Sequence, residues 1–346
     1  MKLKFFLALA FSLMVLSKTS SAAPEHWAVV DHIQIGGLGG WDYLVAEPET
    51  GRLFVSHARQ VVVVDLKTKS IIGSIAANGV HGIALAPELD RGFISNGADG
   101  KVDVFDLSTL KILDSLPAGM NPDAICYDPA TKRVFAFNGK SGTATVIDAA
   151  AEKVVGEIQL GGKPEFAAAD LRGAVFDALE DKGEILKINA TTLAIEQRWS
   201  LPEGSEPSGL AIDSANERLF IGCENQTMIV LDGTSGKVIR TLPIGAGVDA
   251  CVYDPIGKRA FASCGDGTLT VIQQTDKDTY AVIEKATTEP RARTMAFDPT
   301  TGTAYLPDAR FGPLPAPTAD QPKPRPPIVP DSMEILVVKD TSKGTS

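Results

Sequence analysis

The sequence predicts an all-β protein, a seven-bladed β-propeller in which every blade is a four-stranded antiparallel sheet. Three observations predict this fold: a unit of about 42 residues that recurs along the chain, four short apolar runs within each unit, and two chain ends that complement one another. One four-stranded sheet buries too little apolar surface to be stable alone. Sheets arranged radially cover one another's faces, and the fold then becomes stable.

The repeat is clearest in RGFISNGADGKVDVFD and RVFAFNGKSGTATVID, which begin at Arg91 and Arg133. Within each unit, short runs rich in β-branched and aromatic residues alternate with turns made of Gly, Asn, Asp and Pro. Such runs are typical of strands, and short turns make neighbouring strands antiparallel. The units are aligned on one position before a turn, which is acidic in all but one of them: Glu47, Ala86, Asp128, Asp170, Asp213, Asp254 and Asp298.

The two chain ends predict how the ring closes. The segment SMEILVVKD, residues 332–340, matches the third run of the repeat but is followed by no fourth run. The segment WAVVDHIQIGG, residues 27–37, matches a fourth run. We therefore expect the N-terminal strand to complete the last blade and to keep both termini from fraying. A two-sheet sandwich or a β-helix, the alternative folds, does not predict such complementary ends.

The first 22 residues have the features of a secretory signal peptide. Lys2 and Lys4 precede the apolar run FFLALAFSLMVL, and Ser20 and Ala22 occupy the small-residue positions of a cleavage site. We therefore expect cleavage near Ala22 and a periplasmic or secreted protein. The propeller domain is expected over residues 23–340, followed by a tail at 341–346. No other run is long enough to predict a membrane span.

Charge and cysteine content restrict the function further. A net charge of -10 argues against a nucleic-acid partner, because general nucleic-acid binding needs a basic surface. Four cysteines are too few for a disulfide-built scaffold of this size. We expect buried free thiols. Cys251 and Cys264 are the best candidates for a disulfide, because a hairpin between them could place them opposite one another.

The residues that begin the innermost strands are expected to converge at one mouth of the central channel and to form a ligand-binding ring. All but one are ionisable: Asp42, His81, Asp123, Glu165, Ser208, Asp249 and Arg293. The turns after the second strands open on the same face, and those strands end at His57, Asn96, Asn138, Leu179, Cys223, Cys264 and Asp308.

Carboxylates gathered around a narrow mouth repel one another unless a bound cation, Arg293 or His81 offsets their charge. One hypothesis is therefore a divalent cation, Ca²⁺ or a transition ion, and no other cofactor is predicted. If the protein is an enzyme, His81 is the candidate general base. The simplest alternative is a hydrated polar funnel in which the acids cap backbone N–H groups. The predicted metal ligands are Asp42, Asp123, Glu165 and Asp249.

A proline-rich insertion, residues 309–332, lies between the second and third runs of the last unit. Eight prolines in 24 residues favour extended, polyproline-like backbone rather than helix or sheet. The insertion emerges beside the channel mouth, so it is predicted to be a lid or a docking arm. The alternative is a disordered surface excursion. Arg310, Lys323 and Arg325 make it basic beside an acidic mouth.

The tetrapeptides Phe93–Asn96 and Phe135–Asn138, each before a glycine turn and a strand ending in Asp, carry a family resemblance. The chain resembles the YVTN-type β-propeller repeat family, whose motif is Tyr-Val-Thr-Asn, over essentially all residues after the signal peptide. Other units deviate, with FVSH, FIGC and FASC at this place. The resemblance implies a secreted or periplasmic seven-bladed propeller. Some relatives resemble nucleic-acid or surface-binding proteins, and some propellers of similar build are lactonases or lyases.

These observations favour a non-catalytic binding or scaffold protein whose channel-mouth face holds an unknown protein or small-molecule ligand. The first alternative is a metal-dependent hydrolase or lyase of the lactonase kind, with the divalent cation at the mouth. Single-stranded DNA binding, by analogy with the resembling family, is a further alternative. The acidic net charge and the lack of an aromatic and basic stripe count against it.

Overall fold

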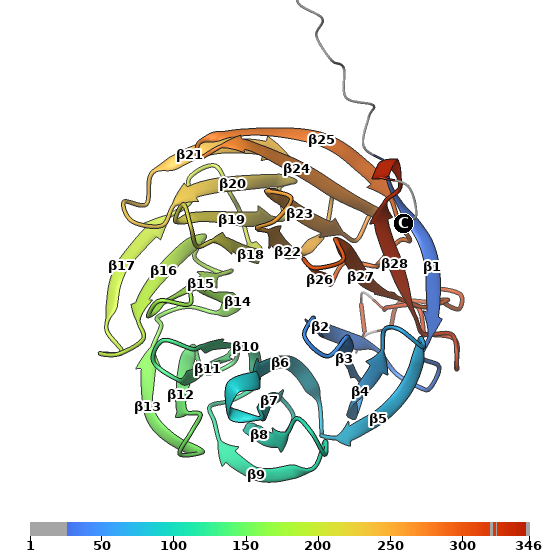
Figure 1. The fold of residues 1–346 in the computed structure, drawn as a ribbon, viewed down its shortest axis with the longest axis horizontal. Helices are drawn as coiled ribbons and strands as arrows, with labels where there is room; N and C mark the ends of the chain where they lie inside the picture. The colour runs from blue at the N-terminus through green and yellow to red at the C-terminus, as the bar shows by residue number, and fades with distance from the viewer. Residues whose placement is uncertain (1–25, 319–320, 323, 344–346) are drawn as a thin grey trace, which may run out of the picture.

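The computed structural model describes residues 26–318, 321–322 and 324–343. Its strands form seven four-stranded antiparallel sheets around a central axis, as predicted (Figure 1). The expected signal peptide, residues 1–22, and the last residues of the tail, 344–346, lie outside the described residues. Within the described ranges, no helix is long and apolar enough to cross a membrane.

Six blades follow the chain order from the innermost to the outermost strand. Blade one contains β2 (Trp41–Glu47), β3 (Arg52–His57), β4 (Gln60–Asp65) and β5 (Ser70–Ala76). Blade two contains β6 (Val80–Ala86), β7 (Arg91–Asn96), β8 (Lys101–Asp106) and β9 (Ile112–Pro117). Blade three contains β10 (Pro122–Asp128), β11 (Arg133–Asn138), β12 (Thr143–Asp148) and β13 (Lys153–Gln159). Blade four contains β14 (Pro164–Ala169), β15 (Ala174–Leu179), β16 (Glu184–Asn189) and β17 (Ile195–Ser200). Blade five contains β18 (Pro207–Asp213), β19 (Arg218–Cys223), β20 (Thr227–Asp232) and β21 (Val238–Pro243). Blade six contains β22 (Val248–Asp254), β23 (Arg259–Cys264), β24 (Thr268–Asp276) and β25 (Thr279–Thr287).

Blade seven joins the two ends of the chain, in the order β1-β28-β27-β26 from the outer edge to the centre. Its strands are β1 (Trp27–Gln34), β26 (Ala296–Asp298), β27 (Thr303–Asp308) and β28 (Glu334–Asp340). The antiparallel register runs from Trp27 opposite Asp340 to Gln34 opposite Glu334, so the predicted closure is confirmed. Two short 3₁₀ helices, η1 (Pro87–Leu89) and η2 (Thr341–Lys343), are the helical elements of the described chain.

The apolar core lies between neighbouring blades rather than inside any one of them. The cluster between blades one and two, for example, combines Phe54 and Val63 with Ile94 and Phe105. A phenylalanine occupies the third position of the second strand in six blades, and each of these is almost completely buried: Phe54, Phe93, Phe135, Phe176, Phe220 and Phe261. The repeated aromatic of the sequence is therefore a packing residue.

The aligned acidic residue of the repeat stabilises the turn after the innermost strand. The Asp298 carboxylate accepts the Thr300 N–H at 2.8 Å, and the Asp128 carboxylate accepts the Thr131 N–H at 3.1 Å. A carboxylate that accepts nearby backbone N–H groups favours the turn over competing conformations. This local role explains why an acid recurs at one place in most repeats.

The four cysteines are free thiols, as expected. The expectation that Cys251 and Cys264 lie opposite one another is wrong. The hairpin pairs Asp254 with Arg259, and this register places Cys251 opposite Ala262. Cys264 instead lies opposite Val248, on the other side of a bulge in the inner strand.

The base of the proline-rich insertion is ordered and paired, which the polyproline-like composition did not predict. Phe311 and Ile328 form an antiparallel β-bridge, and the Gly312 N–H donates to the Pro327 carbonyl at 2.8 Å. The Asp331 N–H donates to the Gly37 carbonyl at 2.8 Å, which anchors the insertion to the segment before blade one. Lys323, one of the predicted basic residues, lies outside the described residues.

Asp177 on β15 is an exception to the apolar packing between blades. Its side chain is fully buried, and neither carboxylate oxygen has a hydrogen-bond partner among the described residues. Blades three and six have Ala136 and Ala262 at the equivalent strand position. Burial, followed by the charge of Glu165, raises the pKa of Asp177 well above its ordinary value. Blade four therefore contains an uncompensated buried carboxyl group, which lowers the stability of the fold.

Replacing this group is expected to stabilise the protein. Asp177→Ala should raise the melting temperature at pH 8 by about 5 °C, because a buried unsatisfied polar group costs about 1–3 kcal/mol. The benefit should shrink toward about pH 4, because the unfolded chain then also holds much of this proton. Thermal unfolding across this pH range measures it. The matched variant Ala136→Asp should lower the melting temperature, and an unchanged value in both variants would contradict the argument.

Candidate functional site at the channel mouth

The predicted ring residues occupy one repeated structural position. In the first six blades, the second residue of the innermost strand is the ring residue. Each of these strands is irregular at that point; the register shifts between Trp41 and Leu44 in blade one, for example. A bulge redirects a side chain away from the regular sheet face. In blade seven, Arg293 precedes the short strand β26.

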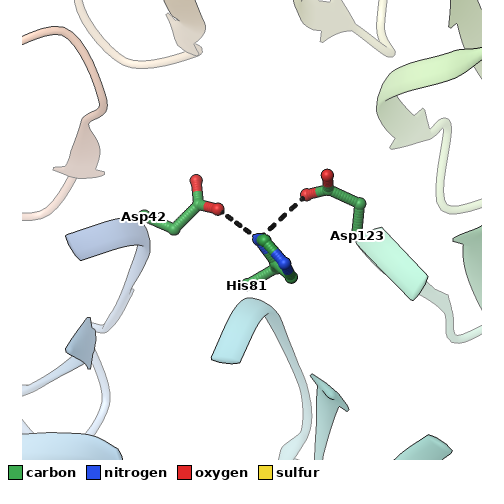
Figure 2. A group of neighbouring side chains, drawn as sticks. All are labelled: Asp42, His81 and Asp123. Atoms are coloured by element: carbon green, nitrogen blue, oxygen red, sulfur yellow. Dashed lines mark hydrogen bonds and ion pairs between the residues drawn. The ribbon is translucent and has the colours of Figure 1, made fainter. Parts of the chain in front are cut away.

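Three ring residues from consecutive blades form one cluster. The Nδ1 atom of His81 lies 2.6 Å from Asp42 Oδ2 and 3.7 Å from Asp123 Oδ1 (Figure 2). The three side chains retain about a quarter of their surface exposed, so the cluster faces solvent while being partly desolvated. We call Asp42, His81 and Asp123 the acid–histidine cluster.

The electrostatics of this cluster favour shared protons. Burial disfavours a charged imidazole, but the hydrogen bond with Asp42 and the charge of Asp123 outweigh it and raise the pKa of His81. Burial and the charge of Asp42 raise the pKa of Asp123 to about 7. Near neutral pH, Asp123 is therefore only partly ionised, and His81 keeps its proton to a higher pH than a free imidazole does.

Two other predicted acids have partners of their own. Burial raises the pKa of Glu165, although its carboxylate lies 2.9 Å from Lys163 Nζ. Burial raises the pKa of Asp249 to about 6 against the effect of Arg293, whose Nε lies 3.2 Å away. The predicted four-acid metal set is thus divided: two members join His81, and two face cations.

Ser208, the neutral member of the predicted ring, is used for structure. Its side chain is buried, and its hydroxyl donates to the Val248 carbonyl of the next blade at 2.9 Å. It therefore supports the mouth through the backbone and offers no free hydroxyl to a ligand.

Sequence reasoning missed a set of serines on the second strands that position the ring. Ser56 donates to the His81 carbonyl, Ser95 to the Asp123 carbonyl, and Ser263 to the Arg293 carbonyl. Each serine is fully buried and belongs to the blade before the one it holds. The signal was present as the third letter of FVSH, FISN and FASC, where the resembling family has threonine.

Tyr43, which follows Asp42, reaches across the ring to blade four. Its hydroxyl donates to the Glu165 carbonyl at 2.9 Å, and its ring lies 5.3 Å from that of Phe166. Burial and the charges of Asp123 and Asp42 raise the pKa of Tyr43 well above its ordinary value. Tyr43 is therefore a neutral hydrogen-bond donor that links blades one and four.

A pocket of about 910 Å³ lies on the same face, under the base of the proline-rich insertion. Residues of the insertion form one wall, and segments 39–41, 246–247, 265–266 and 291–293 form the rest. Its volume is in the range of small-molecule sites. Arg293 belongs to both the pocket and the predicted ring, so the two features are continuous.

Comparisons with known proteins show the fold. The WD40 repeats of RRP9 align over 91% of this chain and 100% of theirs, with a TM-score of 0.75 and 8% sequence identity. The structure of U3-55K covers 88% of this chain and 97% of its own, with a TM-score of 0.73 and 8% identity. A chain of hydrazine synthase from Kuenenia stuttgartiensis covers 78% of this chain and 92% of its own, with a TM-score of 0.68 and 15% identity.

Sequence comparison is more limited. No family model matches the chain. A pre-rRNA-processing protein, IPI3 of Meyerozyma guilliermondii, is 32% identical over 83 residues, which are 24% of this chain. That match spans 18% of the length of the yeast protein.

The acid–histidine cluster makes a pH-dependent prediction. Asp123→Asn should raise the melting temperature at pH 8 by about 2 °C or more and leave it nearly unchanged at about pH 4. The pKa of Asp123 is about 7 in the folded protein and 3.8 ordinarily, so the folded state holds the proton more tightly. Its ionisation therefore lowers stability progressively between about pH 4 and about pH 7, and a neutral amide avoids that loss.

Thermal unfolding of both proteins across this range measures the difference. The exposed residue Glu49 provides a control, because Glu49→Gln removes the same charge away from the cluster. A change in melting temperature that is equal at all pH values would contradict the placement of Asp123 beside Asp42.

Proposed function

We propose that the chain is an exported, non-catalytic binding protein that holds a small molecule or a protein segment on its channel-mouth face. One observation carries the proposal: the proline-rich insertion, found in one blade only, forms one wall of a pocket of about 910 Å³ beside the ring of charged residues. A repeated scaffold with a single elaborated loop at its charged mouth is suited to binding at that loop.

Membership of the YVTN-type repeat family and cleavage of a signal peptide near Ala22 are part of this proposal. The repeat tetrapeptides Phe93–Asn96 and Phe135–Asn138 support the first, and the apolar run after Lys4 supports the second. The mass of the mature chain recovered from the periplasm or culture medium tests the cleavage. An intact N-terminus on the exported chain would overturn it.

Shortening the insertion tests the binding function. Gly312 and Pro327 are hydrogen-bonded neighbours, so residues 313–326 can be replaced by an Asn-Gly turn without separating the anchored base. The probes are 2-naphthoate, 2-naphthalenemethanol and 2-naphthylmethylammonium, which share a ring and differ in charge. Saturation-transfer NMR should show at least one probe bound to the natural chain and its signal lost in the shortened one.

The melting temperature should change little in the shortened chain, because the described residues 313–318 are exposed. A shortened chain that binds as the natural one does, or a natural chain that binds no probe, would contradict a ligand site under the insertion.

The second candidate function is a metal-dependent hydrolase or lyase, which the acid–histidine cluster favours. One ligand atom from each of Asp42, His81 and Asp123 lies within 4.8 Å of the others. Two carboxylates and an imidazole are suitable ligands for a divalent transition ion, and Ca²⁺ would use the carboxylates alone. In this function the cation would polarise a carbonyl group of the substrate.

Elemental analysis after dialysis against a mixture of Ca²⁺, Zn²⁺ and Mn²⁺ tests this candidate. About one equivalent of a single metal is expected in the natural chain, with loss in His81→Ala and in Asp123→Ala. Glu165→Gln and Asp249→Asn serve as controls and should keep the metal, because Lys163 and Arg293 occupy those carboxylates. Absence of a stoichiometric metal would leave the binding function as the better account.

A further inference from the structure

The pocket under the insertion has a charge opposite to that of the whole chain. Arg291, Arg293 and Arg325 line it, and among the described residues of its wall Asp266 is the one carboxylate. That carboxylate accepts the Ala246 N–H at 2.8 Å and the Thr268 hydroxyl at 2.7 Å, so local turns already use it. The pocket is therefore a basic site, although the chain as a whole carries a net charge of -10.

The three guanidinium groups differ in what they contact. Arg293 lies 3.2 Å from Asp249, which belongs to the ring. Among the described residues, no carboxylate forms an ion pair with Arg291 or Arg325. Two arginines from separate segments thus face one pocket with their hydrogen-bond donors available to a ligand.

The apolar side of the pocket is aromatic. The ring centroids of Trp41 and Phe311 lie 6.1 Å apart, and both side chains are half-buried. The guanidinium of Arg291 lies 4.7 Å from the centre of the Phe311 ring, which places it beside the aromatic wall. Ile328 of the insertion packs beside Trp41 in the same apolar cluster. A planar ring that enters the pocket therefore meets a flat apolar surface next to a positive charge.

The backbone at Arg291 is held in a conformation that favours glycine. Its φ angle is +78°, the largest among the described residues other than glycine. The Arg291 N–H donates to the Gly265 carbonyl at 2.9 Å, and Gly265 lines the same pocket. A non-glycine residue in this region is strained, and strain of this kind is concentrated at functional sites.

We propose that this pocket binds a small anionic ligand that joins a planar ring to a carboxylate or phosphate group. The ring lies against Trp41 and Phe311, and the anion accepts hydrogen bonds from Arg291 and Arg325. The inference rests on the proposed binding function and adds the chemical class of the ligand. The acids of the ring, such as Asp249 next to Arg293, are not part of the pocket wall. They would attract a cationic ligand to the ring rather than to the pocket.

Titration calorimetry with ligands of matched shape tests the charge and the ring separately. The ligands are 2-naphthoate, 2-naphthyl phosphate, 2-naphthalenemethanol and inorganic phosphate. At least one naphthyl anion should bind with one site per chain and about tenfold more tightly than the neutral alcohol. Inorganic phosphate alone should bind at least tenfold more weakly than 2-naphthyl phosphate. The stronger of the two naphthyl anions identifies carboxylate or phosphate as the natural group.

Variants assign the anion to the two arginines. Arg291→Gln and Arg325→Gln should each weaken binding of the tighter naphthyl anion by about tenfold. Arg240→Gln is the matched control, because Arg240 is exposed on the outer strand of blade five and loses the same charge. A second variant, Arg291→Gly, relieves the unfavourable φ angle; it should keep the fold, and its melting temperature separates lost binding from unfolding.

The outcomes distinguish this inference from the proposed function. Binding of the neutral or cationic naphthyl probe alone, lost when the insertion is shortened, would overturn the anionic class and keep the binding function. Binding of 2-naphthoate that survives in both arginine variants would also overturn it. If the natural chain binds none of the naphthyl compounds, both proposals fail.

Discussion

A ring of sheets is stable only while its first and last segments stay together, and one strand pairing provides this here. The pairing of β1 with β28 completes blade seven from residues at opposite ends of the chain. Trp27 at the start of β1 is buried, and its ring packs edge-on against Phe261 of blade six at 4.8 Å. Because the core lies between blades, the apolar interfaces of blade seven with blades six and one depend on this closure. The mouth depends on it too, since Arg293 and Asp42 belong to the blades that the closure brings together.

Within the closed ring, the polar mouth is positioned by backbone rather than by side-chain contacts alone. Bulges at the start of the innermost strands turn the ring residues away from the sheet faces. Buried serines of one blade then hold the carbonyl groups of ring residues in the next, as Ser56 holds His81 and Ser95 holds Asp123. Adjacent blades therefore fix one another's functional residues, which keeps like charges at short distances despite their repulsion.

The mouth has two electrostatic halves. Blades one to four contribute the acid–histidine cluster and the Glu165–Lys163 pair, where burial raises the pKa values of the carboxyl groups. The other half is the pocket under the insertion, which is lined by arginines and to which the insertion itself contributes Phe311 and Arg325. Arg293 joins the halves through Asp249. The repeated scaffold supplies the acids, Trp41 and Arg293, whereas the insertion adds Phe311 and Arg325.

The sequence by itself determined the number of blades, the order of strands, the closing strand and the position of the ring residues. These features follow from the length of the repeat and from its turn residues, which can be read within each repeat. Only the tertiary structure decided which ring residues meet. Asp42 and Asp123 contact His81, while Glu165 and Asp249 pair with Lys163 and Arg293. The sequence does not determine these pairs, because the distances depend on bulges and on contacts between blades. Three further features could not be read from the sequence: the pairing of Cys251 with Ala262, the buried Asp177 carboxyl without a hydrogen-bond partner, and the pocket under the insertion. Each depends on strand register or on packing between separate segments of the chain.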